Sequence, residues 1–186
     1  MADPSKPSEP EVDPKAGLMD EARDWVREAS QNVWFRNGLI IAFVIAALDQ
    51  LSKYWIVHVI DLPARRQIDL SSVMDFTYVQ NFGASFGMLA GGMGSRILLL
   101  TISTGVALGL TVWLGRLHRP IAATGIAFII GGAVGNLIDR ALLGYVVDFI
   151  DFSGLWFPWV FNVADTAINV GVGLLLLDAW RTRDEA

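Results

Sequence analysis

Four aspartates stand close together in a strongly apolar part of the chain, and their side chains are the clearest candidates for chemistry. They lie between two apolar runs, within residues 131–165, and are Asp139, Asp148, Asp151 and Asp165. A carboxylate beside hydrocarbon is energetically costly and needs a reason to be there. Two carboxyls that meet share a proton, so one can act as a general base on water while the other polarises a carbonyl. We predict that Asp148 and Asp165 form such a catalytic pair.

Spacing alone does not choose this pair, because each aspartate also has an ordinary interpretation. Asn162 is a good helix N-cap, and Asp165 stands at the third helical position, where backbone N–H groups and the helix dipole favour any acid. Asp148 by itself is compatible with an ordinary loop residue, and Asp151 with a solvated one. The residues therefore leave the choice open until the rest of the chain is considered.

The composition is that of an integral membrane protein. Of the 186 residues 53% are hydrophobic and 18% are charged, whereas an ordinary soluble domain has about 25% charged residues. The formal net charge of -5 belongs mainly to an acidic N-terminal segment, and no basic cluster with interleaved aromatic residues predicts nucleic-acid binding. The absence of cysteine excludes disulfides, a cysteine nucleophile and thiolate metal sites. With only two histidines, we do not expect a zinc site, and a pair of acids that activates water needs neither a metal nor a cofactor.

Hydropathy predicts a membrane all-α fold, a bundle of four transmembrane helices with a small extramembrane β-cradle and a second outward loop. Rough alternation within residues 68–79 favours strands and is the basis for the cradle. Two G-x-x-x-G steps, at residues 105–109 and 131–135, predict close helix packing. The membrane domain covers residues 38–180, with spans at about 38–59, 97–114, 121–138 and 162–180, and with outward loops at 61–96 and 139–161.

Two tails flank this domain. Residues 1–37 form a tail that we expect to be disordered to about Met19, because it is rich in proline and charge. From Leu18 to Trp34 apolar residues recur at helical spacing. This pattern indicates either an amphipathic helix on the membrane surface or a solvated helical extension. Residues 181–186 form a short second tail.

The distribution of lysine and arginine predicts the orientation of the four spans. Positive charges prefer the cytoplasmic side of a membrane. One side, formed by both termini and the turn at 115–120, carries Lys6, Lys15, Arg23, Arg27, Arg36, Arg116, Arg119, Arg181 and Arg183. The other side carries only Arg65, Arg66, Arg96 and Arg140. We therefore expect cytoplasmic termini, with Asp148 and Asp165 held at similar depth near the outer face.

Two charged residues lie inside the first span. Asp49 and Lys53 are four residues apart with the acid first, which is the favourable order for an ion pair on one helical face. A different class of function uses such charges directly, namely a small transporter that relays protons or cations through Asp49, Asp165 and Asp178. A transporter should spread its polar residues through the depth of the membrane, whereas here they concentrate near one face. A scaffold protein is a third alternative, but it would not require several acids and amides around one cleft.

Four sequence blocks together resemble the lipoprotein signal peptidases, or signal peptidase II. They occur in the order and spacing of that family, over about residues 38–180, and read DQLSKYWI, NFGASFGML, GGAVGNLIDRALLGYVVDFIDF and FNVADTAINVG. The resemblance implies an aspartyl endopeptidase of the bacterial inner membrane. Such an enzyme removes the signal peptide from prolipoproteins just before a diacylglyceryl-modified cysteine. It implies lipidated prolipoproteins and membrane lipid as partners, and we expect a monomer.

The resemblance also separates the aspartates by role. It implies that Asp148 and Asp165 are catalytic and that Asp151 serves solubility alone. Residues that support this pair or contact substrate are then Asp49, Lys53, Asn81, Asn136, Asp139, Arg140 and Asn162. Among these, the amides and Arg140 would hold the substrate backbone, and Asp139 would fix Arg140. Asp49 and Lys53 would brace the first helix.

Overall fold

The computed structural model confirms the predicted four-helix membrane bundle and describes residues 14–83 and 93–183. The four helices long and apolar enough to span a membrane cover Val33–Val59, Arg96–Arg116, Pro120–Leu142 and Val163–Arg183. They belong to α2 (Val33–Tyr54, continued by a π-helical turn at Trp55–Val59), α4 (Met93–Arg116), α5 (Pro120–Leu142) and α6 (Val163–Arg183). The latter half of the NFGASFGML block, from Ala84 on, lies outside the described residues.

Helices α2, α4 and α5 each extend four or five residues beyond the expected span at one end. Helix α2 begins five residues early because the Asn32 side chain caps it, accepting hydrogen bonds from the backbone N–H of Trp34 (2.9 Å) and Phe35 (3.4 Å). Helix α5 runs to Leu142, so the assignment of Asp139 and Arg140 to the following loop is wrong. The Arg96 side chain donates to the carbonyls of Arg140 (3.0 Å) and Ala141 (2.6 Å), which have no partner within the helix.

Helix α5 is the centre of the bundle, and its glycines let the neighbouring helices approach closely. A Cβ atom on Gly132 would lie 2.3 Å from the backbone oxygen of Ala164 on α6. On Gly131 it would lie 2.7 Å from the backbone oxygen of Ala42 on α2. The prediction of close packing is therefore confirmed for the step at 131–135. It is wrong for the step at 105–109, where no described atom lies within 4 Å of a Cβ added to either glycine.

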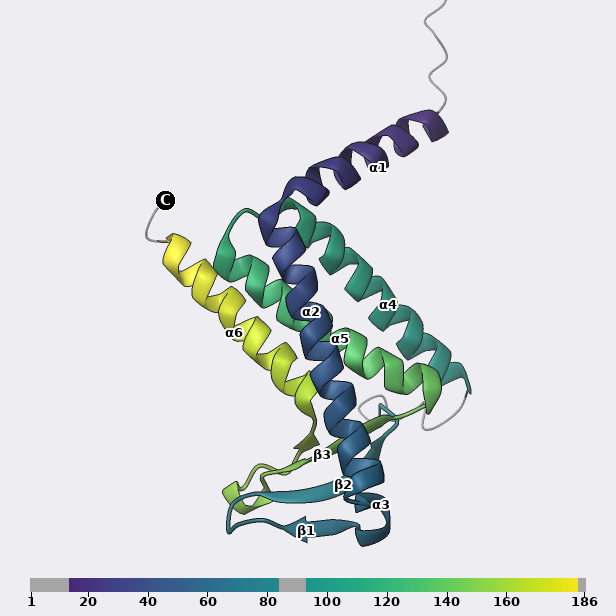
Figure 1. The fold of residues 1–186 in the computed structure, drawn as a ribbon, viewed down its shortest axis with the longest axis vertical. Helices are drawn as coiled ribbons and strands as arrows, with labels where there is room; N and C mark the ends of the chain where they lie inside the picture. Colours follow the sequence, from purple (N-terminus) through teal and green to yellow (C-terminus); the bar gives the residue numbers. More distant parts are fainter. Residues whose placement is uncertain (1–13, 84–92, 184–186) are drawn as a thin grey trace, which may run out of the picture.

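A four-stranded antiparallel sheet lies at the end of the bundle opposite the start of α2 and the end of α6 (Figure 1). Its strands follow in the order β1 (Gln67–Asp69), β2 (Asp75–Asn81), β3 (Val146–Asp151) and β4 (Val160–Phe161). The predicted extramembrane sheet is confirmed, but half of its strands come from the second outward loop. Strand β3 has no alternating pattern because both of its faces are buried. Asp148 thus lies in a paired strand opposite Val79, and its interpretation as an ordinary loop residue is wrong.

The N-terminal tail contains helix α1 (Pro14–Gln31), which projects sideways from the end of the bundle (Figure 1). It begins before Met19, so residues 14–19 are helical rather than disordered as expected. Residues 1–13 lie outside the described part.

A short helix, α3 (Leu62–Arg65), connects α2 to the sheet. Ile56 and Leu62 pack with Val147 and Phe149 of β3 in one buried apolar cluster. This packing attaches β3 to the end of the first span.

The glycines of α5 and α4 give a matched test of this packing. We expect Gly132→Ala to lower stability by on the order of 2 kcal/mol, because its methyl group would collide with the α6 backbone. Gly109→Ala places the same methyl group in open space on α4 and should be neutral or slightly stabilising. Thermal unfolding in one detergent measures both. Equal midpoint shifts in the two variants would contradict the packing described here.

Candidate active site

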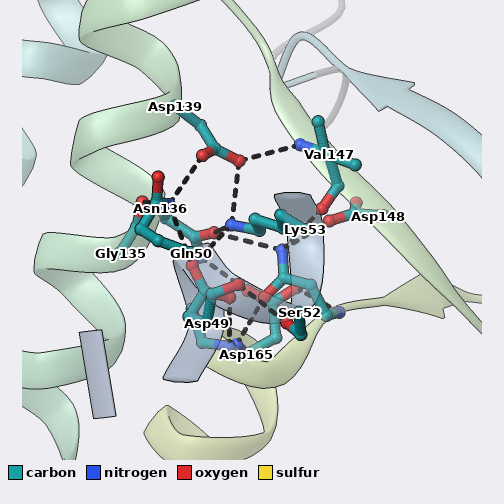
Figure 2. Close-up of polar contacts among 12 residues, drawn as sticks. Asp49, Gln50, Ser52, Lys53, Gly135, Asn136, Asp139, Val147, Asp148 and Asp165 are labelled. Carbon is teal, nitrogen blue, oxygen red and sulfur yellow. Dashed lines mark hydrogen bonds and ion pairs between the residues drawn. The ribbon is translucent and has the colours of Figure 1, made fainter. Parts of the chain in front are cut away.

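A buried cluster of charges joins α2 to α5 beside strand β3 (Figure 2). The Lys53 ammonium lies 2.8 Å from an oxygen of Asp49 and 2.8 Å from an oxygen of Asp139. The predicted ion pair between Asp49 and Lys53 is therefore confirmed, and it has a third member. All three side chains are buried, so each charge depends on the others for the stabilisation that water would otherwise supply.

The same cluster fixes the start of α6. The second carboxylate oxygen of Asp49 accepts a hydrogen bond from the backbone N–H of Ala164 at 2.9 Å. The first N–H groups of a helix have no partner within it, and a negative charge there is favoured by the helix dipole. One side chain on the first span thus holds the first turn of the last span.

Asp139 holds the strand that carries Asp148. Its carboxylate accepts from Lys53, from the Gln50 amide at 2.9 Å and from the backbone N–H of Val147 at 3.0 Å. The expectation that Asp139 fixes Arg140 is wrong, since its side chain points to these partners instead. The reason is that Lys53 and Val147 bring a charge and an unpaired N–H to its side of the helix.

Gln50 is a member of the cluster that sequence reasoning missed. It donates to Asp139 and also to the carbonyl of Gly135 (3.1 Å) and to Asp49 (3.2 Å). The available signal was a polar amide next to Asp49 in an otherwise apolar span.

Asn162 places the two proposed catalytic aspartates relative to each other. Its side-chain oxygen accepts from the backbone N–H of Asp165 (2.9 Å), and Asp165 accepts in return from the backbone N–H of Asn162 (3.3 Å). The predicted helix cap is therefore confirmed and is reciprocal. The Asn162 amide nitrogen donates to Asp148 at 2.7 Å. One residue thus binds both carboxylates, from β3 and from α6.

Two further amides complete the arrangement. Asn136 on α5 donates to Asp165 at 2.8 Å, while its oxygen accepts from Asn162 (3.1 Å) and Lys53 (3.2 Å). Asn81, at the end of β2, donates to the other oxygen of Asp148 at 3.0 Å. Hydrogen bonds from amides therefore hold both carboxylates and connect them to the charge cluster.

The two carboxylates differ in their surroundings. Asp148 is only 1% exposed, whereas Asp165 is half-buried. Burial raises the pKa of Asp148 to about 6, and the nearby charge of Asp165 acts in the same direction, against the hydrogen bonds from Asn81 and Asn162. Beside Asp165 lies a cavity of about 380 Å³ lined by Phe157, Trp159, Phe161, Asp165, Ile168 and Asn169.

Two other predicted residues take different places. Arg140 stands one helical turn after Asn136, and its Nε atom is buried without a hydrogen-bond partner among the described residues.

Asp151 is buried and accepts from the Thr77 hydroxyl (2.7 Å) and the Ser153 N–H (2.8 Å), so the expectation that it serves solubility alone is wrong. Burial opposes ionisation of Asp151, but these two hydrogen bonds outweigh it and lower its pKa. Pairing of β2 with β3 brings Thr77 to this carboxylate.

Comparisons with known proteins show the family of the chain. A family model described as Signal peptidase (SPase) II matches residues 41–181. The chain belongs to this family. A lipoprotein signal peptidase of Caulobacter vibrioides is 49% identical over 153 residues, covering 80% of this chain and 91% of the relative. One of Brevibacillus brevis is 45% identical over 143 residues, covering 76% of this chain and 93% of the relative.

Two solved structures of bacterial membrane enzymes have a similar fold. A bacterial membrane enzyme structure obtained by the in meso method at 2.3 Å resolution has a TM-score of 0.68 and 26% identity, covering 80% of this chain and 90% of that one. A second such structure, at 1.9 Å, has a TM-score of 0.66 and 29% identity, covering 77% and 92%. Membership in the signal peptidase II family gives this bacterial membrane protein a lipoprotein signal peptidase function, and with it protease activity. The family match begins after α1.

The charge cluster predicts unequal effects of removing its members. Lys53→Met leaves two buried carboxylates without a counter-charge and should cost about 3–5 kcal/mol of stability. Asp139→Asn leaves the neutral pair of Asp49 and Lys53 and should cost clearly less. Thermal unfolding compares the variants. A larger loss for Asp139→Asn than for Lys53→Met would show that the cluster is not held by charge balance.

The raised pKa of Asp148 predicts a pH dependence of stability. Its value in the folded chain, about 6, lies above the usual 3.8. Folding thus favours the protonated form of the Asp148 carboxyl. The contribution of Asp148 to the free energy of unfolding is fully present below about pH 4 and is lost as the pH rises through about 6. Relative to Asp148→Asn, the wild type should lose thermal stability over this range. The exposed Asp69→Asn serves as control, and a parallel pH dependence of wild type and Asp148→Asn would contradict the assignment.

Proposed function

We propose that the chain is an aspartyl endopeptidase in which Asp148 and Asp165 activate a water molecule against the peptide bond of a prolipoprotein. The observation that carries the proposal is the shared hydrogen bonding of the two carboxylates through Asn162 and Asn136. Membership in the signal peptidase II family supports the same reaction class.

In the proposed mechanism Asp148 carries the shared proton, since burial raises its pKa to about 6. Asp165, half-buried beside the cavity, takes a proton from water as the oxygen attacks the scissile carbonyl carbon. Asp148 donates its proton to the carbonyl oxygen, and a tetrahedral intermediate forms without a covalent enzyme adduct. Its collapse breaks the C–N bond and returns the protons to the leaving amine and to the pair.

Arg140 and Asn81 have the chemistry to bind the substrate backbone. The buried Nε of Arg140 has no partner among the described residues, and a buried donor without a partner is costly. A carbonyl oxygen of a bound peptide would satisfy it. Asn81 donates to Asp148 from the end of β2 and so lies at the edge of the same site. These two residues would orient the peptide while the reciprocal cap orients the acids.

We infer that the substrates are lipidated prolipoproteins, cut just before the diacylglyceryl-modified cysteine. The relatives are named lipoprotein signal peptidases, and a site at the end of a membrane bundle suits a substrate that arrives laterally. The acyl chains would stay in the bilayer, which makes membrane lipid the second partner. A monomer suffices for this reaction, and no metal or cofactor takes part in it.

The proposed location is the bacterial inner membrane, with cytoplasmic termini and the site near the outer face. Lysine and arginine are concentrated on the side of the termini. The sheet and the start of α6 lie at the opposite end of the bundle (Figure 1), and they carry Asp148, in β3, and Asp165, in the first turn of α6.

The alternative of a proton or cation transporter receives no support from the aspartates it would need. Asp49 is paired with Lys53, and Asp178 with Arg119 at the end of the bundle near the termini. Asp165 accepts from Asn136 at the far end. Asp49 and Asp165 are joined through Lys53 and Asn136 at the same end of the bundle, and only Asp178 lies at the other end, so the three acids do not form a relay through the depth of the membrane.

Purified protein and a lipidated prolipoprotein peptide test the catalytic assignment. We expect Asp148→Asn and Asp165→Asn each to reduce kcat by at least about 10³-fold, because neither acid alone can both activate water and polarise the carbonyl. Asp69→Asn, the same change at an exposed acid of β1, should leave cleavage unchanged. Thermal unfolding of each variant verifies that the fold is intact.

Three outcomes would contradict the proposal. Cleavage by both dyad variants would remove the carboxylates from the chemistry. Inhibition of the wild type by chelators would point to a metal enzyme. Cation flux in liposomes without any peptidase activity would favour the transporter.

A further inference from the structure

Helix α1 carries an apolar face that the bundle covers only in part. Its apolar residues fall on one arc of the helix at about 100° per residue, in the order Trp25, Leu18, Ala29, Ala22, Val26 and Met19. Ala29 is 1% exposed, whereas Leu18, Met19 and Val26 are 66%, 60% and 57% exposed. The edge that carries Val26 and Met19 is therefore open, whereas the edge that carries Trp25 is packed near the bundle, at Ala29, and exposed farther along the helix, at Leu18.

Contacts with the bundle fix how α1 is rotated. The Trp25 ring packs edge-on against Phe35 of α2, with centroids 5.8 Å apart. It also lies against Gly115 of α4, where a Cβ atom would come within 2.7 Å of the ring. The Asn32 amide, between α1 and α2, donates to the carbonyls of Gly115 (3.2 Å) and Leu117 (2.7 Å). Because Trp25 is held against α2 and α4, the rotation of α1 about its own axis is fixed, and so is the direction in which its open edge faces.

Charge is distributed unevenly on either side of the arc. Arg23 lies beside Met19 and Val26, and Arg27 follows Arg23 one helical turn later on the polar face, whereas acidic side chains flank the edge that carries Trp25. Asp20 forms an exposed ion pair with Arg23 at 3.4 Å, which is worth little in water. The open apolar edge is thus bordered by guanidinium groups, the pattern found on helices that lie on anionic membrane surfaces.

Helix α1 lies directly before the first membrane-spanning helix. A single residue, Asn32, separates α1 from that helix. Helix α1 then leaves the end of the bundle sideways and does not continue the line of α2 (Figure 1). An amphipathic helix that leaves a span in this direction can lie along the surface of the membrane that the span crosses.

We propose that α1 lies in the surface of the same membrane, with Leu18, Met19 and Val26 in the boundary between headgroups and acyl chains and with Arg23 and Arg27 against anionic phospholipid phosphates. The occupant of the open edge is the leaflet on the side of the termini, which the proposed orientation makes the cytoplasmic one. The helix lies before the region matched by the peptidase family, so this contact is separate from catalysis.

The chain lacks cysteine, which permits spin labels at single introduced cysteines in the full-length protein. Met19→Cys and Val26→Cys report the open edge, and Asp24→Cys reports the opposite face of the same helix. Each labelled protein is reconstituted in phosphatidylcholine, alone or mixed with phosphatidylglycerol. Collision rates with oxygen, which partitions into the bilayer, and with a water-soluble nickel chelate are then measured.

We expect a several-fold higher ratio of oxygen to nickel collisions at positions 19 and 26 than at position 24, and a further rise with phosphatidylglycerol. Arg23→Gln combined with Arg27→Gln, in the Val26→Cys background, should abolish that further rise. Equal, water-like ratios at all three positions would overturn the proposal and leave a solvated extension. Spin–spin broadening at Val26 would overturn it in favour of a second copy of the chain. Peptidase activity, assayed separately, reports the proposed function and not this contact.

Discussion

The arrangement of this protein depends on one buried cation. The Lys53 ammonium stands between the carboxylates of Asp49 and Asp139, and those two acids reach on to the first turn of α6 and to the strand that carries Asp148. Each of these charges would be costly to bury alone. The cluster therefore stabilises helices α2, α5 and α6 and strand β3 only when all four pack around Lys53. A cluster of this kind contributes a defined geometry more than it contributes stability.

The proposed catalytic acids are placed by neutral groups in contact with that cluster. Asn136 receives a hydrogen bond from Lys53 and donates to Asp165, while Asn162 donates to Asp148. Amides can orient a carboxylate without supplying the positive charge that would hold it ionised. This leaves burial as the main influence on Asp148, whose pKa rises to about 6, while Asp165 stands half-buried beside a cavity. The asymmetry suits a pair that shares one proton.

The path from α5 to the site is short and tightly held. Arg96 of α4 binds the last carbonyls of α5, and Gly144 follows with a φ of 85°, a conformation that favours glycine. Strand β3 begins two residues later, and the contact from Asp139 to the Val147 N–H closes the turn. Helix α4 otherwise stays at the edge of the bundle, and the open face at Gly105 and Gly109 reflects that position.

The four spans, the ion pair of Asp49 with Lys53 and the cap formed by Asn162 could all be predicted from the amino-acid sequence, because hydropathy, helical spacing and capping depend on neighbours within a few residues. The family blocks also singled out most residues of the candidate site. Four other features became visible only in the folded chain: β3 joins the sheet, Asp139 binds Lys53 and Val147 rather than Arg140, Gln50 belongs to the cluster, and Asp151 is buried. Each of these depends on a partner far away in the chain. Local pattern cannot specify such a partner, since its position is fixed only when helices and strands pack.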